Sequence, residues 1–279
     1  MRGRMLRPTA LIFGLSLALA PAAGAVVIDF STEDDFSTAL INGQIVDPTF
    51  DALDLEFGNL FSLTSTQIAG SNNGATIFDS DPNGPNSGSQ DLDLLVDLGN
   101  ILILQSNNPG NANDTSVDGS VGLIYDNPND EADFADRGSL VFSFIGPVIL
   151  QSFDIVDANG GFIADVILTD GAAGGALTRT YSVNSKFSQD INTCGSCDGF
   201  ETLDLTILTD QIGEGGGTAT AVEDLGFDAS DVVKLEIKLI GNPSSGGIDN
   251  LTFVPEPSTG VLLALGLLGL SARRNFRRR

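Results

Sequence analysis

The chain consists of short apolar runs that are separated by clusters of Gly, Asn, Asp and Ser. Apolar and polar residues alternate in the clearest of these runs, Leu140–Ile145 and Val233–Ile240. In the second run, Lys234, Glu236 and Lys238 take the polar positions. A period of two residues is typical of a β-strand with one face in the core and the other in water.

Twelve runs of this kind are expected to form strands, because turn residues bound each of them. They are Val26–Phe30, Asp54–Leu63, Ala75–Phe78, Ile101–Gln105, Val121–Tyr125, Ser139–Ile145, Val148–Asp157, Phe162–Thr169, Thr178–Val183, Thr202–Thr209, Val232–Ile240 and Ile248–Val254. A short helix is expected at Glu33–Leu40, with Ser31 or Thr32 as its cap. The pattern therefore predicts an all-β fold, an antiparallel jelly-roll-like β-sandwich in one domain over residues 26–253.

The first 25 residues differ from this pattern. Arg2, Arg4 and Arg7 precede an apolar stretch at 10–20, and Ala23-Gly24-Ala25 follows it. Charged, apolar and small-residue regions in this order are typical of a secretory signal peptide, so residues 1–25 are expected to be removed before Val26. A retained membrane anchor is the alternative, although the apolar stretch is short for a span.

The C-terminal end, residues 254–279, joins Pro255-Glu256-Pro257 to an apolar run at 260–272 and a cluster of arginines that ends at Arg279. The arginines are expected to stay on the cytoplasmic side of a membrane. This tail resembles the PEP-CTERM tails of exosortase-sorted proteins in Gram-negative bacteria. The resemblance implies a hydrophobic sorting helix held transiently in the inner membrane, recognition by an exosortase at Pro255, Glu256 and Pro257, cleavage, and release to the cell surface or the extracellular matrix. An ordinary tail anchor is the alternative.

Composition narrows what the segment between the two ends can do. Residues 26–253 contain five Lys or Arg and 36 Asp or Glu, which gives a net charge of −31. Such a surface repels nucleic acid and anionic lipid, and it attracts divalent cations. The chain has no His, which excludes a Ser-His-Asp triad and any His-containing zinc site. It also has no Trp, so a sugar-stacking platform would depend on Phe, Tyr125 or Tyr181.

The strongest candidate for chemistry is the segment Asp79-Ser-Asp-Pro-Asn-Gly84. Alternating oxygen side chains before a Gly match the first half of a calcium-binding loop. The twelfth position holds Gln90 where an EF-hand has Glu, but two acids follow it directly. The residues expected to bind Ca²⁺ are Asp79, Asp81, Asn83, Asp91 and Asp93. A solvated turn rich in Asp and Asn is the alternative.

Two further acidic groups are weaker candidates for calcium. The loop 126–133, together with Asp136, is either solvated or part of a shared calcium site. Asp249 and Asn250 in the expected last strand could meet Asp29 near the first, where a structural calcium would tie the two ends of the sandwich. The plainer interpretation, which we prefer from the sequence, is that Asp249 only forms hydrogen bonds with a neighbouring loop.

Cys194 and Cys197 are the only cysteines of the chain and form a C-x-x-C pair. Export to an oxidising compartment favours a small-loop disulfide between them. A zinc site would need two more ligands of this kind, and the chain has no further Cys and no His. Redox activity and thiol-linked assembly remain as alternatives.

The body also resembles a recurrent domain of PEP-CTERM proteins, through Gln90–Leu94, Leu98–Leu104, Gly138–Phe144 and Ile248–Phe253. The resemblance implies a β-sandwich of carbohydrate-binding-module-like shape. We therefore expect a non-enzymatic, calcium-stabilised protein of the cell surface or extracellular matrix. The alternatives are a calcium-dependent module that binds extracellular polysaccharide and a carboxylate-based glycosidase or lyase, which needs only two suitably spaced acids.

Overall fold

The structure is a computed structural model, and it describes residues 24–46, 56–67, 74–87, 94–105, 117–118, 124–125, 128, 138–156, 164–172, 176–188, 199–240 and 246–256. These residues form fourteen strands and no α-helix. The strands are β1 (Val26–Ile28), β2 (Phe61–Gln67), β3 (Ala75–Asp79), β4 (Asn100–Leu104), β5 (Val117–Asp118), β6 (Ile124–Tyr125), β7 (Gly138–Val156), β8 (Ala164–Asp170), β9 (Thr178–Val183), β10 (Phe200–Asp204), β11 (Gln211–Ile212), β12 (Thr218–Glu223), β13 (Val232–Leu239) and β14 (Gly247–Pro255). No helix in this described part is long and apolar enough to span a membrane.

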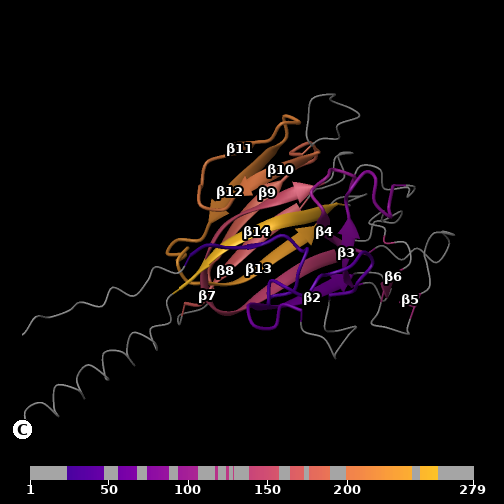
Figure 1. Cartoon of the computed structure of the whole chain (residues 1–279). Helices are drawn as coiled ribbons and strands as arrows, with labels where there is room; N and C mark the ends of the chain where they lie inside the picture. Colours follow the sequence, from indigo (N-terminus) through magenta and orange to yellow (C-terminus); the bar gives the residue numbers. More distant parts are fainter. Residues whose placement is uncertain are drawn as a thin grey trace, which may run out of the picture. The chain divides into compact units, whose positions relative to one another are not determined.

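The long strand β7 belongs to two layers of antiparallel strands (Figure 1). Its first part lies between β2 and β13, where Phe142 is opposite Leu63 and Leu235. This layer continues through β8, β9, β12 and β11. The second part of β7 lies between β10 and β14, and that layer continues through β4 and β3. The expected all-β antiparallel sandwich is therefore confirmed.

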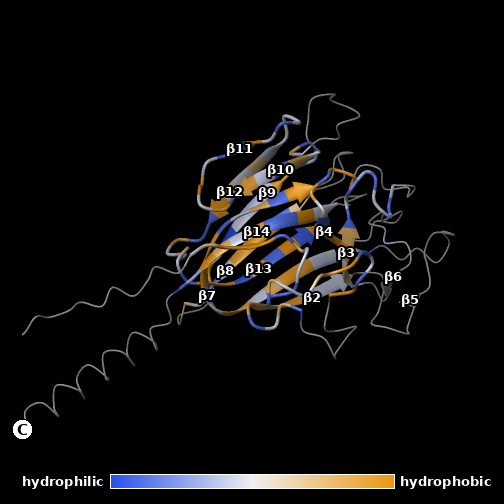
Figure 2. Ribbon diagram, viewed as in Figure 1, coloured by the Kyte–Doolittle hydropathy of each residue, from blue (hydrophilic) through white to orange (hydrophobic). Residues whose placement is uncertain are grey.

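One main hydrophobic core lies between the layers. In β8, for example, Ala164, Val166 and Leu168 are buried and the residues between them are half exposed. Phe61 contacts several other rings in this core, with centroids 5.3 Å from Phe142 and 5.8 Å from Phe144. Figure 2 shows hydrophobic stretches along the strands of both layers.

A smaller cluster packs on the outer face of the second layer and contains Phe78, Leu94, Ile101, Ile103 and Val156. The strands beneath it are buried on both faces, which explains why β4 reads as a continuous apolar run rather than an alternating one. This part of the outer face is therefore covered, and the acidic site described below lies on the same face.

The expected helix at Glu33–Leu40 is wrong. The segment forms turns instead, and an isolated bridge joins Thr32 to Ala39. The carboxylate of Asp35 accepts hydrogen bonds from the backbone N–H groups of Ser37 and Thr38, at 2.8 and 2.7 Å. Such local side-chain bonds compete with helix formation.

Several strand boundaries also differ from expectation. The strand expected at Asp54–Leu63 begins only at Phe61, because residues 56–60 form a turn. The two strands expected on either side of Gly146-Pro147 form the single strand β7. Of the run expected at Val121–Tyr125, the structure describes only β6 (Ile124–Tyr125), and strands β5, β11 and β12 were not expected.

Candidate functional site

The candidate site lies where β14 departs from regular pairing. Between Asp249 and Thr252, β14 contains one residue more than the segment of β7 from Asp154 to Ser152. Asn250 lies within this bulge and adopts a positive φ of 51°. A β-bulge redirects the side chains beside it. β1 pairs with β14 just beyond the bulge, and it ends immediately before Asp29.

Asp249 is the central residue of this site, and its side chain is almost completely buried, with 1% of the residue exposed. Its Oδ1 atom has no hydrogen-bond partner, which holds for no other buried side-chain N or O atom in the described part of the chain. Burial raises the pKa of Asp249 to about 8, and the nearby charges of Asp154 and Asp29 act in the same direction. A hydrogen bond from the Asn250 backbone N–H acts against them.

Asp154 of β7 lies directly opposite Asp249 and is also buried. One of its carboxylate oxygens accepts a hydrogen bond from the Thr202 hydroxyl on β10. The other accepts a hydrogen bond from Asn250 Nδ2 at 2.8 Å. Two neighbouring strands, β10 and β14, therefore hold Asp154 in place, whereas Asp249 keeps an acceptor atom unused.

A buried carboxylate with an unused acceptor can be neutralised by a proton or by a cation. Carboxylate, amide and backbone oxygens suit a hard cation such as Ca²⁺. Within the described ranges, no three His, Cys, Asp or Glu side chains already gather with the spacing of a metal site. A cation here would therefore use Asp249 together with other oxygen atoms around the bulge. Because 1% of Asp249 and 7% of Asp154 are exposed, a glycan cannot reach this pair for acid–base catalysis.

The structure brings together three of the five residues predicted to bind calcium. Asp79 ends β3, and Asp81 and Asn83 follow in one turn. Asp79 Oδ1 accepts a hydrogen bond from the Asp81 N–H at 3.0 Å, and Asp81 Oδ1 accepts one from the Asn83 N–H at 2.7 Å. These bonds are those of a turn rich in Asp and Asn. Asp91 and Asp93 lie outside the described residues, so the predicted five-ligand site stays a prediction.

Of the other candidate residues from the sequence, the structure describes the side chain of Tyr181 but not the cysteines or the acidic loop. Tyr181 is fully buried, and its one hydroxyl proton is shared between the backbone carbonyls of Leu205 and Ile207, so Tyr181 cannot form a sugar-stacking platform. Cys194, Cys197, the side chain of Tyr125 and the acidic residues between 126 and 136 lie outside the described residues. The predicted disulfide therefore stays a prediction.

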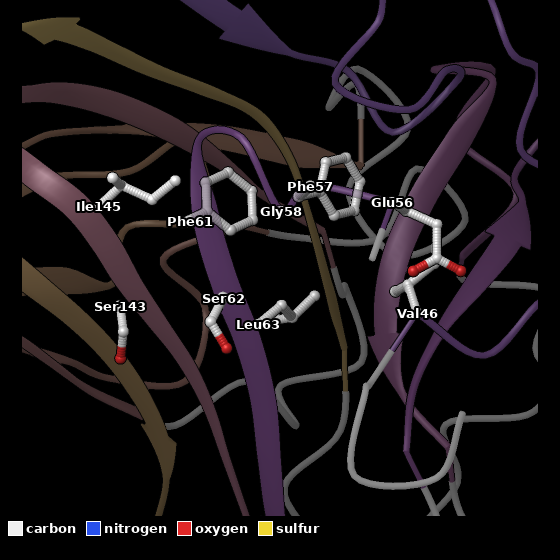
Figure 3. Close-up of a pocket in the computed structure, with 9 residues that line it drawn as sticks. All are labelled: Val46, Glu56, Phe57, Gly58, Phe61, Ser62, Leu63, Ser143 and Ile145. Carbon is white, nitrogen blue, oxygen red and sulfur yellow. The ribbon is translucent and has the colours of Figure 1, made fainter. Parts of the chain in front are cut away.

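A separate cavity of about 310 Å³ lies beside strand β2 (Figure 3). The stacked rings of Phe57 and Phe61, 5.1 Å apart, line it together with the hydroxyl residues Ser62 and Ser143. Glu56 also lines the cavity, and it accepts a hydrogen bond from Gln44 Nε2 at 3.2 Å. Apolar walls with a few polar groups are typical of small-molecule sites. The sequence did not indicate this cavity, because the turn at 56–60 was expected to be part of a strand.

The last described residues connect the sandwich to the C-terminal tail. Pro255 ends β14 opposite Val148, and the Glu256 N–H donates a hydrogen bond to the Pro147 carbonyl at 3.1 Å. Residues 253–279 match the PEP-CTERM protein-sorting motif. The match begins within β14, so the sorting motif overlaps the last strand of the sandwich. Pro257 and the apolar run lie outside the described residues.

Two further comparisons complete the description. No curated protein matches the chain. Among solved structures, the family 11 carbohydrate-binding module from Clostridium thermocellum, in complex with a beta-1,3-1,4-mixed-linked tetrasaccharide, is similar at 13% identity and a TM-score of 0.32. The similarity covers 69% of this chain and 88% of the module. A TM-score this low carries no argument about a ligand.

Sequence reasoning missed Asp154 and Thr202 at the candidate site. Asp154 is the one charged residue in the otherwise uncharged stretch from Ser139 to Val156, which is the signal that could have identified it. Its position opposite Asp249 depends on strand register, which the sequence alone does not provide. Asp29 lies near enough to Asp249 for its charge to help raise the pKa of Asp249, as the second interpretation from the sequence suggested, and a calcium ion between them stays a prediction.

Proposed function

We propose that the protein is an exported surface or extracellular-matrix protein that an exosortase processes at its C-terminus. The sorting motif at residues 253–279 is the observation that carries this proposal. The apolar run at 260–272 holds the chain in the inner membrane until the exosortase cuts near Pro255-Glu256-Pro257, and the sandwich is then released. In this proposal the sandwich is non-enzymatic, and the burial of Asp249 and Asp154 supports this for the candidate site.

Processing is tested by expressing the full chain with and without an exosortase and then fractionating the cells. With the exosortase, the sandwich should leave the inner membrane and lose mass at its C-terminus. Replacing Pro255, Glu256 and Pro257 together by Ala should leave the chain in the membrane. The matched control replaces Ser258 and Thr259 by Ala, which keeps the tripeptide, and this variant should be released normally. Release of the triple variant at the normal rate would contradict the proposal.

The second part of the proposal is that calcium stabilises the sandwich at Asp249. Its unused Oδ1 atom, its burial and the neighbouring Asp154 and Asp29 support a bound cation, since an ionised carboxylate is otherwise costly in such a place. The net charge of −31 over residues 26–253 favours cation binding over the whole surface. The loop with Asp79, Asp81, Asn83, Asp91 and Asp93 is a second calcium site in this proposal.

Calorimetric titration of the chelator-treated chain with Ca²⁺ separates the two sites. Asp249→Asn should remove one site and leave the other, and Asp81→Asn should have the opposite effect. Each variant therefore serves as the control for the other. A titration that shows no calcium binding in the unchanged chain would remove the calcium part of the proposal and would leave the sorting part intact.

The alternative function is the binding of extracellular polysaccharide in the cavity beside β2. The cavity supports it because the exposed Ser62 and Ser143 offer hydroxyl groups beside the exposed side chain of Ile145, while the buried rings of Phe57 and Phe61 form its wall. A glycan array probed in the presence of calcium tests this function. Binding that is lost when Ser62 and Ser143 are replaced by Val would support it, and an array without any bound glycan would contradict it.

A further inference from the structure

We propose that one end of the sandwich rests against the lipid headgroups while the tail is still in the membrane, and that Val27, Ile145 and Ile149 contact the lipid. We call this region the processing end, defined by Val26–Ile28 of β1, Ile145–Ile149 of β7 and Val254–Glu256. The inference rests on the proposed sorting function and adds an orientation and a lipid-contact surface to it.

Strand pairing brings the expected signal-peptide cleavage site and the start of the C-terminal tail to this same end. Val26, the expected first residue after signal-peptide cleavage, lies opposite Phe253 of β14. Val254 and Pro255 of β14 lie opposite Ile149 and Val148 of β7. The two segments that hold the chain to the membrane during export therefore leave the sandwich from neighbouring strands.

The sandwich continues into the sorting motif without a free linker. The hydrogen bond from the Glu256 N–H to the Pro147 carbonyl, 3.1 Å long, fixes the chain one residue before Pro257. Four residues lie between Glu256 and Val261 in the apolar run, so five Cα-to-Cα steps join the two. An extended chain spans at most about 18 Å over that length.

This reach limits how far the sandwich can lie from the headgroups of the bilayer. The polar headgroup layer is about 6 Å thick on each side of the hydrocarbon core. When Val261 lies at the edge of that core, at most about 12 Å of water can separate Glu256 from the headgroups. The processing end is therefore the part of the sandwich that the tail holds next to the membrane.

The side chains at this end suit an apolar surface. Ile145 is 67% exposed, Val27 is 48% exposed and Ile149 is 36% exposed. Gly146 and Pro147 between the two isoleucines are exposed as well, and Glu256 at the start of the tail is the one charged residue in the three segments that define this end. Removing exposed aliphatic side chains from water is favourable.

The lipid contact is expected to be apolar rather than electrostatic. Residues 26–253 carry a net charge of −31, so anionic headgroups repel the sandwich as a whole. Contact should therefore be closer on vesicles of phosphatidylcholine than on vesicles that also contain phosphatidylglycerol.

The absence of Trp from the chain allows a clean test with a single reporter. Ile145→Trp places the reporter at the processing end of the full chain. The control, Ile212→Trp, replaces another exposed isoleucine, 75% exposed, on β11. β11 pairs with the start of β12, which lies opposite Val183 at the far end of β9. Both variants are reconstituted through the tail into phosphatidylcholine vesicles with and without brominated acyl chains.

We expect the brominated lipid to quench the Ile145→Trp reporter and to leave the Ile212→Trp reporter unchanged. If the chain floats with the vesicles but both reporters respond equally, the lipid contact is wrong and the sorting function stands. If the chain does not float with the vesicles, the tail anchor and the proposed function fail together. A third result is an Ile145→Trp reporter whose fluorescence is blue-shifted but not quenched by brominated lipid. It would mean that another occupant, such as a second copy of the chain, covers the processing end. This result would overturn the inference.

Discussion

Asp249→Asn gives the most informative test of the buried site, because it removes the charge and keeps the shape of the side chain. Burial raises the pKa of Asp249 from 3.8 to about 8. Between these two pH values the folded chain holds a proton that the unfolded chain releases, so the free energy of unfolding falls as the pH rises. From below pH 3.8 to pH 7 the loss is about 4 kcal/mol for the calcium-free chain.

The Asn variant does not have this ionisation cost. It does place an amide near Asp154, and an unsatisfied buried polar group costs about 1–3 kcal/mol. Without calcium at pH 7, we therefore expect Asp249→Asn to raise the free energy of unfolding by about 1–3 kcal/mol. At pH 4 the advantage should disappear, because Asp249 is then protonated in the folded chain.

Calcium should reverse the order of the two proteins at neutral pH. A ligand at 1,000 times its dissociation constant stabilises the folded state by about 4.1 kcal/mol, which exceeds the advantage of the Asn variant, and only the chain with an ionised Asp249 can gain this at the buried site. The assay is urea unfolding at pH 4, 7 and 9, in chelator and in excess calcium. Asp81→Asn serves as the control, since it changes the other predicted calcium loop and leaves Asp249 in place.

Two results would refute this reasoning. The first is an Asp249→Asn variant that is less stable than the unchanged chain at pH 7 in chelator. The second is a calcium-induced stabilisation of the Asp81→Asn chain that does not change when Asp249→Asn is added to it. Either result would mean that ionising the buried Asp249 does not destabilise the folded chain in a way that a bound cation offsets.

Two further predictions concern the fold that supports the site. Tyr181→Phe should lower the free energy of unfolding by about 0.5–1.5 kcal/mol in urea, because it removes the hydrogen bond of the hydroxyl while the Leu205 carbonyl keeps its bond from Arg179 Nη1; an unchanged stability would contradict this role of the hydroxyl. Gly213→Ala should destabilise the chain by more than about 3 kcal/mol, because the added Cβ would lie 1.8 Å from the Phe187 carbonyl oxygen. The control Gly146→Ala meets no atom within 4 Å and should change stability by less than about 0.5 kcal/mol, so equal melting temperatures of the two variants would contradict the expected clash.

The sequence predicted the architecture because alternation is a strong signal in strands with one buried face. It failed where a local or a long-range contact decides the structure. Gly146 and Pro147 were expected to separate two strands, but β7 continues through them. The pairing of β7 with β13 is irregular at this point, between Val232 and Lys234 of β13. The Pro147 carbonyl still accepts a hydrogen bond from the Glu256 N–H. Proline is tolerated in a strand where no N–H donor is needed.

The candidate site was predicted only in part, for a related reason. Asp29 and Asp249 could be connected from the sequence, because they lie near the ends of the expected first and last strands. Asp154 could not be connected to them, since the order of strands β10, β7 and β14 and the bulge at Asn250 bring it into position. A change of register by one residue would move each of these side chains to the opposite face of the sheet.

The central claim, sorting by C-terminal processing, is tested most directly by the intact mass of the protein recovered from the cell surface or medium of a host that has an exosortase. The account predicts a chain that starts at Val26, ends near Pro255-Glu256-Pro257 and lacks the apolar run at 260–272. A recovered chain that still ends at Arg279, or a chain that stays in the inner membrane although the exosortase is present, would contradict the account.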